Sequence, residues 1–277
     1  MLKSLLVALD DTPGAQAAAA VALTLARSTG ARLTAATILD LPHTRDASEP
    51  VPPGGGAFLE RRNARLQEQA EQDAAAASAA FDALCGDTPH QIVTLGDAPQ
   101  EALLRAGAAH DLIVLGRDST LGREETEDGL APTIPELLRD GSRPLLVVPP
   151  GATLTDGPVI AAYDGSTGAA DALQAFALLG LAGDRPVKAV SVSDDRAVAT
   201  QQAGEAAGLL ARHGARAEPV SILGDRPADA ILAILAADQA SMLVMGAFEN
   251  SALRTYFTGS ATMTLLREAP CPVFVHR

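Results

Sequence analysis

Short apolar runs alternate along the chain with longer segments that are amphipathic or rich in alanine. The runs at 112–115 and 243–245 are apolar at consecutive positions, which is typical of strands covered on both faces of a sheet. The longer segments have the length of helices. The alternation predicts strands at 4–9, 32–39, 90–95, 111–115, 144–148, 158–163, 186–192, 216–222, 241–245 and 272–276, and helices at 14–28, 58–84, 98–108, 132–140, 167–180, 196–213, 226–237 and 260–268.

The chain contains an internal repeat. The first apolar segment, 5–12, recurs at 159–166, an offset of 154 residues. The next landmark recurs at an offset of only 128 residues. Because 154 − 128 = 26, the first half carries an insertion of 26 residues before that landmark, which we place at 41–66. Its first part is rich in proline and glycine and is predicted to be a flexible loop. Three later landmarks recur at offsets of 128, 130 and 128 residues: 96–99 at 224–227, 112–116 at 242–246, and 144–148 at 272–276.

Two domains follow from the repeat. Strand–helix alternation requires right-handed crossovers, so each half is predicted to be an α/β domain with a doubly wound, five-stranded parallel sheet. We place the domains at 1–150 and 158–277, joined by a linker that begins with Pro149 and Pro150. Such a sheet binds ligands beyond the carboxyl ends of its strands, where the strand order reverses.

Composition narrows the classes of function. The chain of 277 residues has 21 basic and 34 acidic side chains, a formal net charge of −13, which argues against nucleic-acid binding. No apolar stretch is long enough for a membrane span, and the first ten residues lack signal-peptide features. The two cysteines do not form a disulfide framework. A cytoplasmic location is therefore expected.

Three features of the second half fall where a ligand is expected. Asp164, Gly165 and Ser166 follow its first strand, Gly246 ends its fourth, and a Gly-Ser pair (259–260) opens its last helix. Glycines let a ligand approach the backbone closely. A helix that begins with Gly-Ser offers N–H groups, a hydroxyl and the positive end of the helix dipole to an anion.

This spacing resembles that of the universal stress proteins in their tandem two-domain form. The phosphate-binding pattern of that family is Gly, two residues, Gly, nine residues, Gly, then Ser or Thr. Here Gly246, Gly259 and Ser260 keep the spacing, but Glu249 stands at the middle glycine. An aspartate after the first strand, Gly-Asp-x-Pro after the third and Pro-Val-Phe-Val near the end also match.

The resemblance implies a fold like that of the adenine nucleotide alpha hydrolases and an ATP site in the second domain, with or without Mg²⁺. Asp164 would contact the adenosine end and the Val192 backbone would contact the adenine edge. The glycines and the start of the last helix would hold the ribose and phosphates. The full set of implied nucleotide-binding residues is Asp164, Val192, Met245, Gly246, Gly259, Ser260, Ala261 and Thr262.

The resemblance also implies how the halves meet. The last strands, 144–148 and 272–276, would pair within one chain to form an intramolecular pseudo-dimer, and a homodimer of the chain is a further option. The first half departs from the phosphate-binding pattern. Ser119 replaces the middle glycine, both alignments of its loop lose the hydroxyl that would follow, and residues 123–128 are strongly acidic. We predict a degenerate first site.

Structural alternatives exist for each candidate. Asp10 and Asp164 suit helix N-caps, Gly246 and Gly259 suit turns, and Glu249 suits a solvated loop. Nucleophile-elbow, Walker and metalloprotease motifs are absent, so a dedicated enzyme is disfavoured. The sequence favours a regulatory or signalling protein that binds adenine nucleotide. A scaffold that has lost nucleotide binding and a weak ATP hydrolase are the alternatives.

Overall fold

The computed structural model describes residues 1–41, 56–122, 128–247 and 261–277. Each predicted strand and helix is present, with every described boundary within two residues of its expected place. In chain order the elements are β1 (Ser4–Leu9), α1 (Pro13–Thr29), β2 (Arg32–Ile38), α3 (Gly56–Cys85), β3 (His90–Leu95), α4 (Pro99–Gly107), β4 (Leu112–Gly116), α5 (Thr133–Asp140), β5 (Leu145–Val148), β6 (Val159–Ala162), α6 (Thr167–Leu179), β7 (Val187–Ser193), α7 (Arg196–Arg212), β8 (Ala217–Leu223), α8 (Pro227–Ala237), β9 (Met242–Gly246), α9 (Ala261–Glu268) and β10 (Val273–His276).

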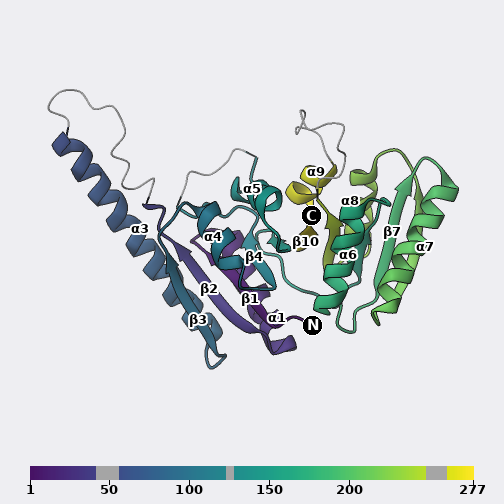
Figure 1. Cartoon of the computed structure of the whole chain (residues 1–277), viewed down its shortest axis with the longest axis horizontal. Helices are drawn as coiled ribbons and strands as arrows, with labels where there is room; N and C mark the ends of the chain where they lie inside the picture. The colour runs from purple at the N-terminus through teal and green to yellow at the C-terminus, as the bar shows by residue number, and fades with distance from the viewer. Residues whose placement is uncertain (42–55, 123–127, 248–260) are drawn as a thin grey trace.

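The described strands form one continuous ten-stranded sheet with the order β3-β2-β1-β4-β5-β10-β9-β6-β7-β8 (Figure 1). All pairs within each half are parallel, as the apolar runs predict. The two halves join through β5 and β10, which run antiparallel with Phe274 opposite Leu146. The predicted contact between the last strands of the two halves is therefore present.

Helices cover both faces of this sheet, so its strands are buried on both sides. Successive residues of β1 point to opposite faces: Leu5 and Val7 belong to one hydrophobic cluster and Leu6 to the other. The first cluster includes buried residues of α1, α3, α6 and α7, and the second those of α4, α5, α8 and α9. This arrangement confirms the doubly wound fold and explains the unbroken apolar runs.

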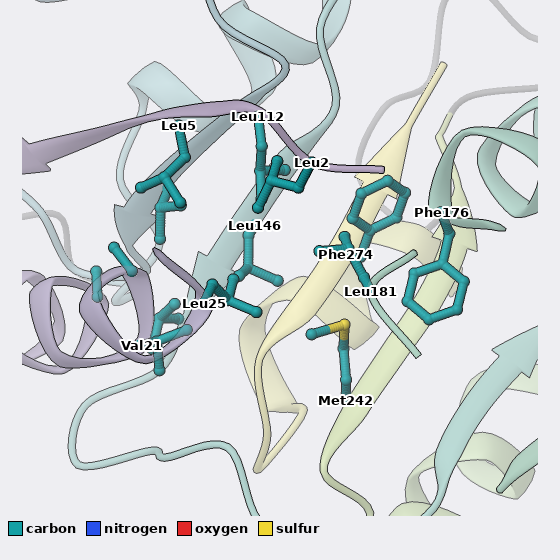
Figure 2. Close-up of a cluster of buried hydrophobic side chains, with 14 of the residues drawn as sticks. Leu2, Leu5, Val21, Leu25, Leu112, Leu146, Phe176, Leu181, Met242 and Phe274 are labelled. Carbon is teal, nitrogen blue, oxygen red and sulfur yellow. The ribbon is translucent and has the colours of Figure 1, made fainter. Parts of the chain in front are cut away.

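One hydrophobic cluster runs through the junction of the halves. Figure 2 shows Leu2 and Leu146 of the first half beside Phe274 of β10. The Phe274 ring contacts that of Phe176 edge to face, with 5.6 Å between centroids. At the other end of the cluster, Val21 lies on α1. The halves therefore share a core rather than only a strand pair.

The first half has a longer second crossover helix than the second half. Helix α3 has 30 residues, whereas its counterpart α7 has 17. Residues 56–66 of the predicted insertion form the first turns of α3, which extend past the sheet (Figure 1). Only Phe81 and Cys85, near its carboxyl end, are buried. Residues 42–55 of the predicted loop lie outside the described part of the chain.

None of the described helices is long and apolar enough to cross a membrane.

Both cysteines are expected to resist thiol reagents in the folded protein. Cys85 and Cys271 are buried and unpaired. Burial raises the pKa of both thiols, and that of Cys271 rises to about 12. Its thiolate fraction at pH 8 is thus roughly a thousandfold below that of an exposed thiol. Labelling with a chromogenic disulfide at pH 8 should be slow until guanidinium is added; rapid labelling without denaturant would contradict this packing.

Candidate functional site

The candidate site lies where the strand order of the second half reverses. Strand β6 pairs with β7 on one side and with β9 on the other, so the carboxyl ends of these three strands are neighbours. Asp164 follows β6, Val192 lies near the end of β7, and Gly246 ends β9. Three of the predicted residues are therefore brought to one edge of the sheet, as expected for a parallel sheet of this type.

Met245 lies in β9 beside Gly246, and the other predicted residues belong to the segment between β9 and α9 or to α9 itself. Ala261 and Thr262 form the first turn of α9, where Ala261 is exposed. Gly259, Ser260 and Glu249 lie outside the described residues. Their predicted roles in holding phosphates, or in obstructing them, therefore stay predictions.

The turn between β6 and α6 is built by the Asp164–Ser166 segment. The backbone N–H of Ser166 donates to Asp164 Oδ1 at 3.0 Å, and Ser166 Oγ accepts from the Ala169 N–H at 3.2 Å. Ser166, and not Asp164, is therefore the N-cap of α6. Between them, Gly165 has a φ of +82°, which suits glycine. The interpretation of Asp164 as a helix cap is wrong: it shapes the turn, and its side chain is exposed.

Gln202 of α7 supports this turn, a contact that no sequence pattern indicates. Its side-chain nitrogen donates to the Asp164 carbonyl at 2.9 Å, and its oxygen accepts from Ser191 Oγ at 2.7 Å. Ser191 lies in β7 and is 1% exposed. Gln202 thus ties the β6–α6 turn to the neighbouring strand. The link joins positions 38 residues apart, which no local pattern reveals.

Gly246 is required by packing between the sheet and α6. A Cβ at this position would lie 2.5 Å from the backbone nitrogen of Ala169. Gly116, its counterpart in the first half, has the same relation to α1, with the Ala15 nitrogen at 2.4 Å. Gly246 has no positive φ, so turn geometry does not explain it. Close approach of helix and strand does, whether or not a ligand also uses the space.

Met245 and Val192 offer a ligand little side-chain surface. The Met245 side chain is buried in the hydrophobic cluster on one face of the sheet. Val192 is half-buried and packs against the same cluster. Only the backbone of Met245 is therefore available at the sheet edge, which agrees with its place in a strand core.

Two carboxylates lie near Tyr163, directly before Asp164. Burial raises the pKa of Tyr163, and the carboxylates of Glu205 and Asp164 raise it further. Two negative charges therefore act on this phenol. A carboxylate repels a phosphate by on the order of 1 kcal/mol at ~4 Å even in water. These carboxylates therefore favour a group that donates hydrogen bonds over an anion at this corner of the site.

The equivalent corner of the first half is closed by its own chain. Asp10 Oδ1 accepts from the backbone N–H of Thr12 at 2.9 Å and from its hydroxyl at 2.6 Å. Asp10 Oδ2 accepts from the Leu121 N–H at 3.0 Å. Leu121, with a φ of 51°, is buried, as is Leu130 beyond it. As in the second half, the helix cap is not the aspartate but the residue two positions later, Thr12.

Two further polar groups of the first half lie where a ligand would approach α1. Asp118 Oδ1 would lie only 1.9 Å from a Cβ on Gly14, at the first turn of α1. Ser119, which stands at the predicted middle glycine, is 1% exposed. Both Asp118 Oδ1 and Ser119 Oγ are buried without a hydrogen-bond partner. A carboxylate therefore stands at the positive end of α1 in place of an external anion.

Two cavities among the described residues lie away from Asp164. One of about 200 Å³ lies between α3 and the ends of β2 and β3, and is lined by Leu39, Glu71, Ala74, Ala75, Ser78 and Thr94. Another of about 370 Å³ lies before β6, β7 and β8, and is lined by Asp156, Asp184, Arg185, Pro186 and Arg216. Among the residues with described positions, no three His, Cys, Asp or Glu side chains form a metal-binding group.

Comparisons with known proteins agree with this architecture. The sequence model of the universal stress protein family matches residues 1–149 and 157–277. The universal stress protein Slr1230 of Synechocystis is 30% identical over 172 residues, which is 60% of this chain and 58% of that protein. The chain therefore spans less than two thirds of the length of this curated relative.

Solved structures resemble the whole chain. The crystal structure of a universal stress protein from Archaeoglobus fulgidus superposes with a TM-score of 0.72 and 16% identity, covering 99% of this chain and 98% of that one. A protein from Pseudomonas aeruginosa, described as a putative universal stress protein, gives a TM-score of 0.57 and 18% identity over 99% of this chain and 93% of that one. At such identities the likeness concerns the fold. Together with the family match over both halves, it shows that the chain belongs to the universal stress protein family as a tandem member.

Proposed function

We propose that the second half of the chain binds an adenine nucleotide, ATP, and that the protein acts as a nucleotide-responsive regulatory protein. The proposal rests on the contrast between Asp164 and Asp10. Both follow the first strand of their half, but Asp10 has both oxygens engaged by Thr12 and Leu121. Asp164 is exposed, and its Oδ2 has no hydrogen-bond partner among the described residues. One copy of the site is closed and the other has an acceptor available.

The available acceptor suits the nucleoside end of the ligand. Asp164 Oδ2 would accept from a ribose hydroxyl or the adenine amine, and the end of β7 at Val192 would offer backbone groups to the base. The phosphates would lie away from this carboxylate, toward Gly246 and the start of α9. There Ala261 and Thr262 begin a helix, whose free N–H groups favour anions. Mg²⁺ would arrive with the phosphates.

Replacing Asp164 by alanine is expected to weaken ATP binding by about tenfold or more, because a hydrogen bond to a charged group contributes ~1.5–3 kcal/mol. Isothermal titration calorimetry of the full chain measures the change. The matched variant Asp10→Ala removes the equivalent carboxylate from the closed half and should leave the affinity within about twofold of wild type. Absence of ATP binding by the wild type, or equal losses in both variants, would refute the proposal.

Glu249 favours a second candidate, a scaffold of the same fold that does not bind nucleotide. This carboxylate stands at the middle glycine of the family pattern and would repel phosphates. If it blocks the site, Glu249→Gly should convert a chain without measurable affinity into one that binds ATP. A wild-type chain that already binds, with an affinity that Glu249→Gly leaves unchanged, would remove the scaffold from consideration.

A further inference from the structure

Helix α9 is held at its carboxyl end by a residue of the other half. Arg267, in its last turn, donates from Nε at 3.0 Å and from an Nη at 2.6 Å to the same oxygen, Asp128 Oδ2. Asp128 belongs to the first half, shortly before α5. The Arg267 side chain is 36% exposed and that of Asp128 is 49% exposed, so protein atoms cover part of each. Charge-assisted bonds of this length are among the stronger polar contacts in proteins.

A second contact from the first half reaches the same end of α9. Arg117, directly after β4, donates from Nη1 to the carbonyl of Ala269 at 3.1 Å. Ala269 is the residue after α9, and its N–H donates back to Leu265. Burial lowers the pKa of Arg117, although Asp118 opposes this effect. A guanidinium nevertheless keeps its charge in proteins, and a cation is favoured at the negative end of a helix dipole.

Both contacting residues are fixed within the first half. Arg117 donates its backbone N–H to Val148 at 2.8 Å, and its carbonyl accepts from the Ala131 N–H at 2.7 Å. Asp128 Oδ1 lies 3.4 Å from the Leu130 nitrogen, and Leu130 is 3% exposed. Arg117 and Asp128 are therefore anchored in the first half, next to Ala131 and Leu130, and hold α9 from there.

The second half contacts the end of α5 differently. Arg277 donates to the carbonyl of Arg139, in the last turn of α5. Arg139 occupies the position in α5 that Arg267 occupies in α9, but it pairs with its neighbour Asp140. The counterpart of Arg117 is Ala247, a buried residue without a side-chain donor. Arg139 and Ala247 therefore do not make the contacts that their counterparts Arg267 and Arg117 make. Helix α5 therefore receives a backbone contact from Arg277, but among the described residues it makes no ion pair with the second half like that of Arg267 with Asp128.

We infer that Asp128 and Arg117 are positioning residues for the nucleotide site of the second half, an inference that rests on the function proposed above. Helix α9 has eight residues and is about 12 Å long, so a tilt at its carboxyl end displaces its first turn at Ala261. Amide groups act on an anion most strongly when they are held in place beforehand. The closed half therefore sets the affinity of the open half.

The test uses the full chain and separates α9 from its ligand. Arg267→Gln and Asp128→Asn each remove the ion pair, and Arg267→Asp combined with Asp128→Arg restores it with reversed charges. Hydrogen exchange of the α9 amides, without nucleotide, should accelerate about fivefold in each single variant, and ATP should bind about fivefold more weakly. The charge-reversed pair should recover most of both losses. At 1 M salt the differences should shrink, because exposed charges are screened.

Arg139→Gln is the matched control, because it removes the equivalent arginine of α5 and should change neither readout. Unchanged α9 exchange in Arg267→Gln, or equal effects of Arg139→Gln, would overturn the inference. Faster exchange with unaltered ATP affinity would also overturn it, because the contact would then be structural only. If no variant and not even the wild type binds ATP, the proposed function fails, and the exchange data alone then report whether the first half holds α9.

Discussion

Phe274→Ala is expected to lower the free energy of unfolding by about 3–5 kcal/mol, the usual range for a buried phenylalanine. Phe274 is 0% exposed and lies between its own half and Leu146 of the first half (Figure 2). The substitution removes the edge-to-face contact with Phe176 and leaves a cavity in the cluster that both halves share. Neighbouring groups cannot easily move into this cavity, because β10 lies between two paired strands, β5 and β9.

Urea unfolding followed by circular dichroism measures this loss as a shift of the midpoint. The control is Phe58→Ala, which removes the same ring from the first turn of α3, where the side chain is 71% exposed. That variant should change stability by less than about 0.5 kcal/mol. A loss below about 1 kcal/mol in Phe274→Ala would mean that the halves do not share a packed core at this junction.

Gly246→Ala is expected to destabilise the chain by about 1–3 kcal/mol, the range for forced overpacking. The added Cβ would meet the backbone of Gly168 and Ala169 at 2.5–2.8 Å, and backbone cannot move aside as a flexible side chain can. Gly116→Ala should behave alike, since its Cβ would meet the backbone of α1 at 2.4 Å. The shared cost would show that these glycines serve helix packing in both halves.

The control for the glycine variants is Gly204→Ala in α7, where nothing lies within 4 Å of an added Cβ. Alanine there should stabilise the helix by about 0.5–1 kcal/mol. Opposite signs for Gly204→Ala and Gly246→Ala in the same denaturation assay are the expected result. A neutral Gly246→Ala would contradict the close approach of α6 to β9.

Sequence patterns were sufficient for the fold because the fold depends on local signals. Apolar runs mark strands buried on both faces, and Pro13 and Gly30 bracket α1 at its first turn and its C-cap. The repeat located the equivalent strands in both halves. Pairing of β5 with β10 was predicted from the resemblance to the family, and it covers apolar strand edges that would otherwise be exposed.

The site was less predictable because its groups meet through long-range contacts. Gln202 supports Asp164 from a different helix, and Leu121 reaches Asp10 from 111 positions away. Neither residue type signals such a contact by itself. Gly246 was singled out as a place where a ligand approaches the backbone, and the group that approaches it in the described structure is α6. A glycine indicates that another group lies close to the backbone, but it does not indicate whether that group is a helix or a ligand.

Joining the halves in a single polypeptide, with one strand pair at the centre, frees each copy to evolve separately. Two identical subunits must carry every substitution twice, so a plug such as Leu121 would block both sites at once. In this chain Leu121 engages Asp10 of the first half, whereas Asp164 Oδ2 of the second half has no partner among the described residues, and Arg139 pairs within α5. Gene fusion therefore permits a division of labour that a symmetric assembly cannot reach by point substitution.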